Sequence, residues 1–399
     1  MVHWKKNLAV VWVSQFLSIM GFFFAFPFAP YYIQELGVRD PVKLKLWVSL
    51  FGAAAPFSLA ICSPIWGAMA DRYGRRLMLL RANFGAAVVL TLMATVRSVE
   101  GLIVLRLLQG LLSGTVTAAQ TMVTSSPPEN RSGTALGALS AAVYSGTMAG
   151  AFLGGISAEY FGYRCSFLGS GLLLQLAGLL IVVGTREEFV PPPPQQDAGR
   201  VTPAAPGIAL AVPLLLLTVT MSFCRQYDYS LFPLLVQEIH GSIQGAAFWT
   251  GSISAVAGLA GFLAGIVFGR LADRVDAPRL AKVSSVGAAL FMVPQGLLYG
   301  FLILFPTRFG MIFCAGGLEP VFQVWLAKVT SVERRGSAFG WAATARSVGW
   351  VGAPLVSGLI ASGFGLRSIY LVGGVQYLLL LMLIGYVGKR LANGPAANR

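Results

Sequence analysis

Six charged side chains lie well inside long apolar stretches of the sequence, where a charge is costly and usually serves a function. Arg225 and Asp228 stand three residues apart in the segment SFCRQYDYSLF, with hydrophobic runs on both sides. An acid in this setting can bind and release a proton, and an arginine can bind an anion or keep the acid ionised. This chemistry suits proton coupling and ion binding. The other four charged residues are Arg106, Arg308, Glu319 and Arg346.

The composition is that of a polytopic membrane protein. Hydrophobic residues make up 56% of the 399 positions and charged residues 11%, against about a quarter charged in a soluble domain. The mean hydropathy is +0.73. Apolar stretches of about 20 residues can each cross the bilayer as a helix, and helices satisfy their own backbone hydrogen bonds there. We therefore predict an all-α membrane protein with about twelve transmembrane helices, near residues 8–34, 46–69, 77–96, 101–124, 134–159, 165–184, 208–236, 247–271, 281–301, 304–327, 337–361 and 368–388.

The net charge of +14 follows the topology and does not indicate nucleic-acid binding. Most of the 29 Lys and Arg residues fall in the N-terminus, in every second loop and in the C-terminus. This asymmetry is the positive-inside pattern, so we expect both termini in the cytoplasm. The first span is too long for a signal peptide and has no small-residue cleavage site after it, so we expect it to remain in the mature protein.

Cysteine and histidine argue against a metal site or a hydrolytic triad. The four cysteines (Cys62, Cys165, Cys224 and Cys314) are scattered in or beside apolar spans, where buried small side chains are the usual case. His3 and His240 lie at a terminus and in an outer loop. An integral-membrane enzyme would need a clustered site, so we expect no enzymatic activity, no metal and no cofactor.

The chain contains two copies of one unit. A shift of 203 residues places PYYIQEL (30–36) on PLLVQEI (233–239) and FGYR (161–164) on FGLR (364–367). A shift of 202 places GAMADR (67–72) on GRLADR (269–274). An even number of spans in each copy makes the repeats parallel, and transporters of this kind bind substrate between their halves. We predict six-helix bundles at residues 1–184 and 208–399, joined by a proline-rich cytoplasmic linker at 185–207.

Three segments resemble signatures of the major facilitator superfamily. The segment GAMADRYGRRLMLL (67–80) resembles the loop signature that latches the cytoplasmic side in this family. LIVLRLLQG (102–110) resembles its fourth-helix motif. GTMAGAFLGG (146–155) resembles the antiporter signature of its fifth helix, with Ala151 in place of the family's proline. The latch residues by this resemblance are Gly67, Asp71, Arg72, Gly74 and Arg75, with Asp273 in the second copy; the antiporter residues are Gly146, Gly150, Gly154 and Gly155, with Pro354 in the second copy.

The resemblance covers essentially the whole chain and is strongest to bacterial twelve-span drug:proton antiporters of the MdtG and tetracycline-efflux type. It implies two pseudo-symmetric six-helix bundles, alternating access, and export of amphiphilic small molecules in exchange for protons, with the proton gradient as the energy source. It also implies a multi-pass protein of the bacterial inner membrane, which we expect to work as a monomer with substrate, protons and the lipid bilayer as its only partners. The glycines of the antiporter signature have a second interpretation, since small residues also let helices pack closely.

The expected mechanism rests on the charged residues of the spans. We predict Asp228, Glu319 and Arg106 as proton-coupling residues, with Asp228 the first candidate acid and Glu319 the second. We place Arg225 and Asp228 on one helix face because they are three residues apart. Glu319 could pair with Arg346 or Arg225, and each acid could instead form a static pair. Arg308, near a span end, is expected to snorkel to the interface. The predicted substrate-binding residues are Arg225, Arg346, Gln15, Phe22, Phe26, Gln120 and Gln323.

The fourth predicted span carries one polar stripe down an apolar helix, suited to a water-filled cavity or to hydrogen bonding between helices. Its residues are Arg106, Gln109, Ser113, Thr117, Gln120 and Thr124. Four arginines against two acids favour neutral or anionic amphiphiles in the cavity. An exporter or flippase of an endogenous metabolite or lipid would have the same fold, and sequence separates the two poorly.

Overall fold

The computed structural model describes residues 3–124, 132–185, 187, 208–329 and 335–392, and nearly all of them are helical. Contacts divide the chain into two compact units. Unit 1 is Met1–Asp197 with Val236–Leu259, and unit 2 is Ala198–Leu235 with Ala260–Arg399. Apart from Thr185 and Glu187, the predicted linker at 185–207 lies outside the described residues. The bundle boundaries predicted from the repeat remain a prediction.

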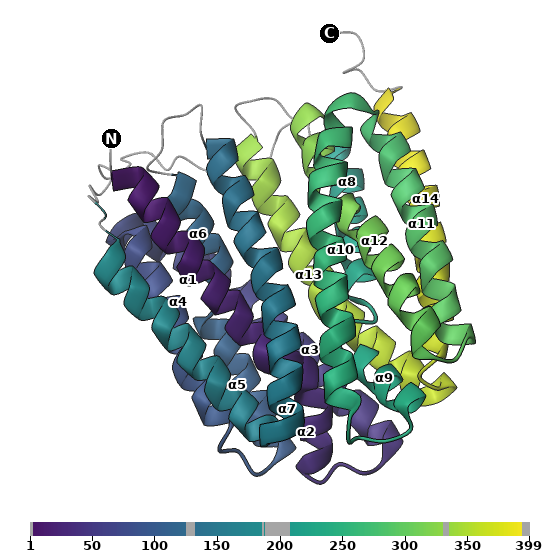
Figure 1. Cartoon of the computed structure of the whole chain (residues 1–399). Coiled ribbons are helices and arrows are strands. Elements are labelled where there is room, and N and C mark those ends of the chain that lie inside the picture. The colour runs from purple at the N-terminus through teal and green to yellow at the C-terminus, as the bar shows by residue number, and fades with distance from the viewer. Residues whose placement is uncertain (1–2, 125–131, 186, 188–207, 330–334, 393–399) are drawn as a thin grey trace. The chain divides into compact units, whose positions relative to one another are not determined.

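Unit 1 is built mainly from the helices of the first repeat (Figure 1). They are α1 (His3–Ala25), the 3-10 turn η1 (Phe26–Phe28), α2 (Ala29–Glu35), α3 (Pro41–Tyr73), α4 (Arg75–Met93), α5 (Val99–Leu112), α6 (Thr115–Thr124) and α7 (Ser132–Gly184). The end of α9 (Phe232–His240) and the first half of α10 (Ala246–Arg274) also belong to this unit.

Unit 2 contains the remaining helices of the second repeat. They are α8 (Ile208–Gln226), α11 (Ala277–Leu297), α12 (Phe301–Val329), α13 (Arg335–Phe364) and α14 (Ser368–Ala392), with the start of α9 and the second half of α10.

The described helices account for the twelve predicted spans. Ten of them are long and apolar enough to cross a membrane. One of these, within α7, is two helices that meet at Gly162, whose φ of +82° is in the left-handed region that favours glycine. The shorter apolar helix Val212–Gln226 in α8 supplies the twelfth span. The predicted all-α membrane fold is confirmed.

The first span of each repeat is interrupted near its end, which the sequence analysis did not predict. In unit 1, α1 ends at Ala25 and the chain passes through η1 before α2 begins. In unit 2, α8 ends at Gln226, and α9 begins at Phe232 after a turn. Pro30 and Pro233, which the repeat aligns, are each the second residue of the helix after the break. Proline has no backbone N–H and disfavours helical conformation in the residue before it. It is therefore tolerated in the first turn of a helix, and both helices begin immediately before their proline.

The predicted fourth span is also broken. It divides at Ser113–Gly114 into α5 and α6, and Gly114 adopts a φ of +115°. Within a membrane the carbonyl groups freed by such a break need other donors. Trp66 of α3 donates from Nε1 to the Leu111 carbonyl oxygen at 2.7 Å, and Arg81 of α4 donates to that of Ser113 at 3.0 Å. The Arg81 guanidinium also lies over the Trp66 ring, 3.5 Å from its centroid.

Three glycines of the antiporter-like signature bring α7 against α1. A Cβ on Gly146 would lie 2.7 Å from the Phe16 carbonyl oxygen, one on Gly150 2.4 Å from that of Met20, and one on Gly154 2.3 Å from that of Phe24. The four-residue spacing therefore makes one groove along α7 that holds the α1 backbone. Unit 2 repeats the contact, because a Cβ on Gly349 of α13 would lie 2.7 Å from the Val219 carbonyl oxygen of α8.

The two arginines of the FGYR and FGLR segments also make equivalent contacts. Arg164 donates to the carbonyl oxygens of Ala94 and Val96, both at 3.1 Å. Arg367 donates to those of Gly296 and Leu298, both at 3.5 Å. Each pair of acceptors lies at the end of the third span of its repeat. The internal duplication read from the sequence is therefore visible in the side-chain contacts.

Val236–Leu259 groups with unit 1 through several polar and close contacts. Gln34 and Gln237, aligned by the repeat, exchange two side-chain hydrogen bonds of 2.8 and 3.1 Å. Tyr31 Oη lies 2.7 Å from Thr250 Oγ1. A Cβ on Gly155 would lie 2.9 Å from the Ala247 carbonyl oxygen, so this fourth glycine of the signature faces α10.

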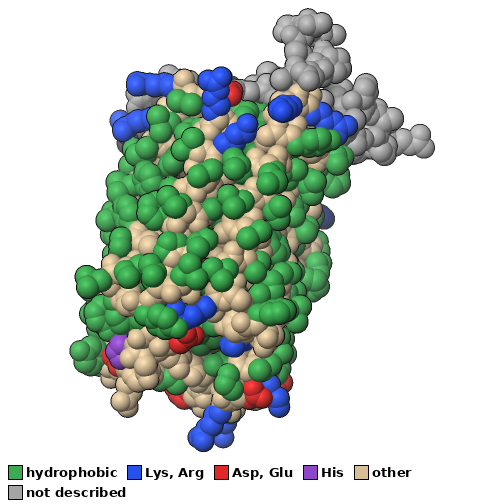
Figure 2. All heavy atoms as spheres, turned by 90° about the vertical axis from the view of Figure 1, so that its right-hand side faces the viewer, with side chains coloured by type: hydrophobic (Ala, Val, Ile, Leu, Met, Phe, Trp, Pro, Cys, Tyr) green, Lys and Arg blue, Asp and Glu red, His purple; other side chains and the backbone are tan. Residues whose placement is uncertain are grey.

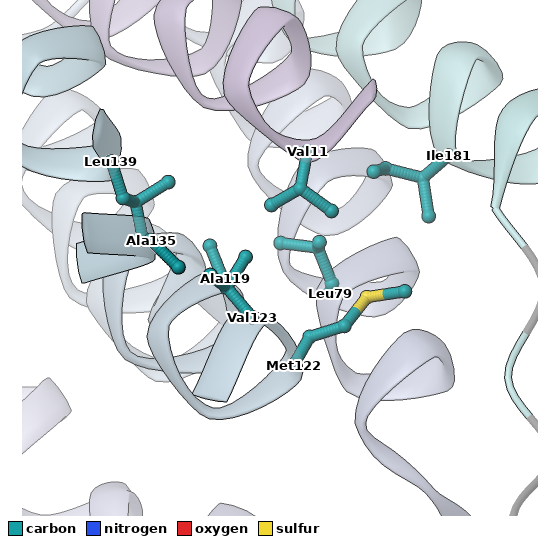
Figure 3. Close-up of a cluster of buried hydrophobic side chains, with 8 residues drawn as sticks. All are labelled: Val11, Leu79, Ala119, Met122, Val123, Ala135, Leu139 and Ile181. Carbon is teal, nitrogen blue, oxygen red and sulfur yellow. The ribbon is translucent and has the colours of Figure 1, made fainter. Parts of the chain in front are cut away.

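Each unit exposes apolar side chains outward and buries others between its helices. The face of the molecule shown in Figure 2 carries hydrophobic side chains across its middle and Lys and Arg toward its ends. Exposed residues of this kind include Val283 and Leu290 on α11 and Leu379 and Met382 on α14. Inside unit 1, a cluster joins α1, α4, α6 and α7 (Figure 3); it consists of Val11, Leu79, Ala119, Met122, Val123, Ala135, Leu139 and Ile181.

The close contact of α1 with α7 predicts how a methyl group added to a glycine of α7 affects the stability of the protein. Gly150→Ala places a Cβ on the Met20 backbone and should destabilise the protein, since overpacking of this kind costs about 1–3 kcal/mol. Gly137→Ala, on the same helix, has nothing within 4 Å of the added Cβ and should be neutral or slightly stabilising. Thermal unfolding of the purified variants measures both. Equal midpoints for the two variants would rule out the close α1–α7 contact.

Candidate functional site

One acid in unit 2 is shared by two arginines. Glu319 of α12 forms an ion pair through Oε2 with Nη1 of Arg225, at the end of α8. Its Oε1 lies 2.8 Å from Nη1 of Arg346, on α13. Gln323, one turn further along α12, donates from Nε2 to the same Oε1 at 3.4 Å. We call these four residues the Glu319 cluster. Both pairings suggested for Glu319 from the sequence are present at once.

The helices place the members of this cluster for local reasons. Arg225 lies in the last turn of α8, where the helix dipole favours a cation. Glu319 precedes Pro320, which lies inside α12, and follows Gly316 and Gly317. A Cβ on Gly317 would lie 2.3 Å from the Phe268 ring, so the absence of a side chain lets α12 approach α10 closely. The ion pair with Arg225 places Glu319 at the end of α8.

The second acid of unit 2 forms a different pair. Asp228 makes an ion pair through Oδ2 with Nη1 of Arg308, on α12. The Arg308 guanidinium also lies over the Phe232 ring, 4.1 Å from its centroid. Asp228 sits in the turn between α8 and α9, where its carbonyl oxygen accepts hydrogen bonds from the backbone N–H groups of Leu231 and Phe232 at 3.1 and 2.9 Å. This residue therefore joins the helix break to α12.

Two predictions about these charges were wrong. Arg225 and Asp228 do not share a helix face, because α8 ends at Gln226 and the chain turns before Asp228. Arg308 does not snorkel to an interface, because it is buried and bound to Asp228. The i, i+3 spacing indicates a shared face only while the helix continues.

The two pairings differ in their access to solvent. The side chains of Arg225, Glu319 and Arg346 keep 28%, 21% and 27% of their accessible surface, whereas those of Asp228 and Arg308 keep 2% and 5%. A group that exchanges protons or binds a ligand must be reachable. The Glu319 cluster meets that requirement in this conformation and the Asp228–Arg308 pair does not.

Unit 1 contains one arginine of the candidate set, held by aromatic rings. The Arg106 guanidinium lies 3.7 Å from the centroid of the Phe26 ring and 4.6 Å from that of Phe51. It donates to Gln109 Oε1 at 2.8 Å, and Gln109 donates to Ser113 Oγ at 3.2 Å. Half of the predicted polar stripe is thus one hydrogen-bonded chain along α5. Thr117 and Gln120 follow on α6, after the break, and are exposed.

The other predicted substrate residues of unit 1 lie on α1 and η1. Phe22 is buried and stacks on Phe26, with ring centroids 5.6 Å apart. Gln15 is buried, and both polar atoms of its amide lack a hydrogen-bond partner among the described residues. The structure brings Phe22 and Phe26 toward Arg106, and it leaves Gln15 as a separate polar site on the same helix.

The predicted latch loop contains a turn at Gly74, which has a φ of +93° and caps α4. Glu187 accepts hydrogen bonds at this cap from the backbone N–H groups of Arg75 and Arg76, at 3.0 and 2.7 Å. Gly67 has open space around it, and Arg72 lies over the ring of Tyr73. The side chains of Asp71 and Asp273 lie outside the described residues, so their latch role stays a prediction.

Sequence reasoning missed three residues that these contacts bring out. Trp66 and Arg81 support the break between α5 and α6, and Glu187 caps α4. For Arg81 a signal was present, since it is a charge inside the predicted span 77–96. For Glu187 the sequence carried no such signal, because its partners are backbone groups more than 100 residues away.

Pro354 of the second signature lies inside α13, where its carbonyl oxygen accepts from Ser357 Oγ at 3.0 Å. Among the described residues, no group of three or more His, Cys, Asp or Glu could hold a metal ion.

Known protein families and sequences resemble this chain over most of its length. A model of the Major Facilitator Superfamily matches residues 11–294 and 250–397. The chain belongs to this superfamily. It is 33% identical over 376 residues to the multidrug resistance protein MdtG of Rahnella sp. (strain Y9602), covering 93% of this chain and 90% of that protein. MdtG of Klebsiella pneumoniae (strain 342) is 30% identical over 373 residues, with the same coverage of both chains.

Among solved structures, a bacterial homolog of the human lysosomal transporter Spinster has a similar fold. Its inward-facing, unoccupied crystal structure gives a TM-score of 0.79 at 16% identity, over 98% of this chain and 99% of that one. The likeness supports the fold alone. Major facilitator proteins are membrane transporters.

The buried Asp228–Arg308 pair predicts a double-mutant result. Asp228→Asn leaves the Arg308 charge buried without its acid, and breaking such a pair costs about 3–5 kcal/mol. The double variant Asp228→Asn/Arg308→Gln removes both charges and should recover much of that loss. Thermal unfolding of the single and double variants gives the coupling. As a control, Asp276→Asn removes an exposed acid with no side-chain cap bond. A double variant no more stable than Asp228→Asn alone would contradict the pairing.

Proposed function

We propose that the protein is a proton-coupled exporter of amphiphilic small molecules that works by alternating access. The observation that carries the proposal is the Glu319 cluster, a partly exposed acid bound to two arginines inside the spans of a major facilitator fold. The names of the MdtG relatives, which cover nine-tenths of the chain, support multidrug efflux as the activity. The interrupted first span of each repeat is further support, since transporters commonly build their sites at broken helices.

Substrate charge follows from the charges of the cluster. With Glu319 ionised, Arg225 and Arg346 leave one positive charge in excess, and the Asp228–Arg308 pair is neutral. A site of this charge favours neutral or anionic amphiphiles over cations.

Proton coupling is assigned in this proposal to Glu319. Its carboxylate either holds two guanidinium groups or, once protonated, releases them, so the cluster alternates between net charges of one and two. A change of charge in a partly exposed site gives the two conformations different proton affinities when their access to water differs. Asp228 and Arg106 stay predicted participants: the first lies in a buried pair, and the second lies in the aromatic and amide setting of α5.

The proposed setting is the bacterial inner membrane, with both termini in the cytoplasm and the monomer as the working form. The apolar helices and the superfamily support a multi-pass membrane protein. The orientation rests on the concentration of Lys and Arg in the termini and in alternate loops.

The assignment of the proton to Glu319 predicts a selective transport defect. Glu319→Gln in proteoliposomes should abolish substrate-driven proton flux, reported by an internal pH-sensitive dye, and should retain substrate exchange at equal pH on both sides. Asp276→Asn serves as the control that changes charge outside the spans. Undiminished proton flux in Glu319→Gln would remove this residue from the coupling. If the folded Asp228→Asn/Arg308→Gln variant loses the flux instead, Asp228 is the coupling acid.

A further inference from the structure

We propose that Glu319 is an internal counter-ion that occupies the anion-binding place of the transport site, and that a substrate bearing a carboxylate or a similar oxyanion binds by displacing it from Arg225 and Arg346. This inference rests on the proposed function and deepens it, because it names the chemical group recognised and the residue that sets the selectivity. Glu319 then opposes the binding of anions, although it lies in the middle of the site that binds them.

The geometry of the carboxylate supports this role. Its two oxygens are divided between two arginines from different helices, Oε2 to Arg225 on α8 and Oε1 to Arg346 on α13. Guanidinium groups present several N–H donors in a plane and recognise planar oxyanions well. A carboxylate from a substrate offers the same two acceptor oxygens. The place that Glu319 fills is thus a binding site for an oxyanion that the chain itself occupies.

Two features of the cluster leave room for an exchange of partners. Nε of Arg346 is buried and has no hydrogen-bond partner among the described residues, so one donor of that guanidinium is unused while Glu319 is in place. Gln323 is exposed, and its bond to Glu319 is long at 3.4 Å. A substrate oxyanion that displaces Glu319 can accept hydrogen bonds from the Arg346 and Gln323 donors that Glu319 now holds.

The Asp228–Arg308 pair shows by contrast why Glu319 is the displaceable acid. Arg308 is covered by Phe232 and Asp228, and the pair retains almost no accessible surface. Removing Asp228 from Arg308 would leave a buried charge, which is strongly unfavourable. Separating Glu319 from its arginines leaves groups that keep a fifth or more of their surface and that a ligand can reach.

Displacement has a consequence for coupling. An anionic substrate and the ionised Glu319 compete for the same donors, so an anionic substrate binds best when Glu319 is protonated. A neutral substrate does not compete in this way. By linkage, an anionic amphiphile should exchange for fewer protons than a neutral one of the same shape.

Equilibrium binding tests the inference without any gradient. The purified full-length protein in lipid nanodiscs is titrated with 9-anthracenecarboxylate and with its methyl ester, which share the ring system and differ in charge. Glu319→Gln should bind the carboxylate about tenfold more tightly than the unaltered protein and should bind the ester unchanged. Arg225→Ala and Arg346→Ala should each weaken binding of the carboxylate and should leave the affinity for the ester unchanged. Asp276→Asn, which makes the same change of charge on the surface, should alter neither.

Several results would overturn the inference. These are an unchanged or weaker carboxylate affinity in Glu319→Gln, an equal gain for the ester, or no carboxylate binding to either protein. If Glu319→Gln does not fold, Glu319→Asp serves instead. It keeps the charge but is too short to span both arginines equally, and it should give a smaller gain of the same sign. A protein that binds as expected but moves no substrate in proteoliposomes would overturn the export proposal and leave this inference standing.

Discussion

An ionised side chain inside the bilayer must have a partner, and this constraint shapes the interior of both units. The cost of an isolated charge there is several kcal/mol at the least. In unit 2, Asp228 is matched with Arg308, and Glu319 is matched with Arg225 and Arg346. Two arginines of unit 1 instead make cation–π contacts with aromatic rings. Arg106 lies against the rings of Phe26 and Phe51, and Arg81 lies over the ring of Trp66. Each charge therefore fixes a contact between specific helices.

The same constraint applies to the backbone, which must not leave polar groups unpaired where a helix is interrupted. At the break between α5 and α6, Trp66 and Arg81 satisfy two of the freed carbonyl groups. At the break between α8 and α9, the Asp228 carbonyl accepts from the next helix while its side chain holds Arg308. Broken helices and paired charges thus occur together, and the two acids of unit 2 take different roles. Asp228 secures a break, and Glu319 remains accessible.

Much of the fold follows from the sequence because its signals are repeated. Apolar length gives the spans, and the shift of 203 residues predicts equivalent contacts, such as those of Gly146 and Gly349 or of Arg164 and Arg367. The signature glycines could be placed on one helix face because their spacing is that of a helical turn. The break at Gly114 could not be placed, since a single glycine inside an apolar run is often tolerated in a helix.

The site was only partly predictable for a related reason. The pairing of Glu319 with Arg346 or Arg225 was among the possibilities drawn from the sequence, because few charges lie inside the spans. The partner of Asp228 was missed because Arg308 lies 80 residues away and because local spacing suggested Arg225. Because α8 ends at Gln226, the three-residue spacing of Arg225 and Asp228 no longer places the two side chains on one helix face. Pairings of this kind depend on where helices stop, which proline and glycine influence without determining.

The central claim is that Glu319, and not Asp228, is the acid of this site that changes its protonation. Infrared difference spectroscopy after a drop in pH reports newly protonated carboxyl groups directly. After subtraction of the signal of the other acids, which all variants share, the account predicts a carboxylic-acid band in the unaltered protein that is absent in Glu319→Gln and retained in the Asp228→Asn/Arg308→Gln variant. A band that persists in Glu319→Gln and disappears with Asp228 would contradict it.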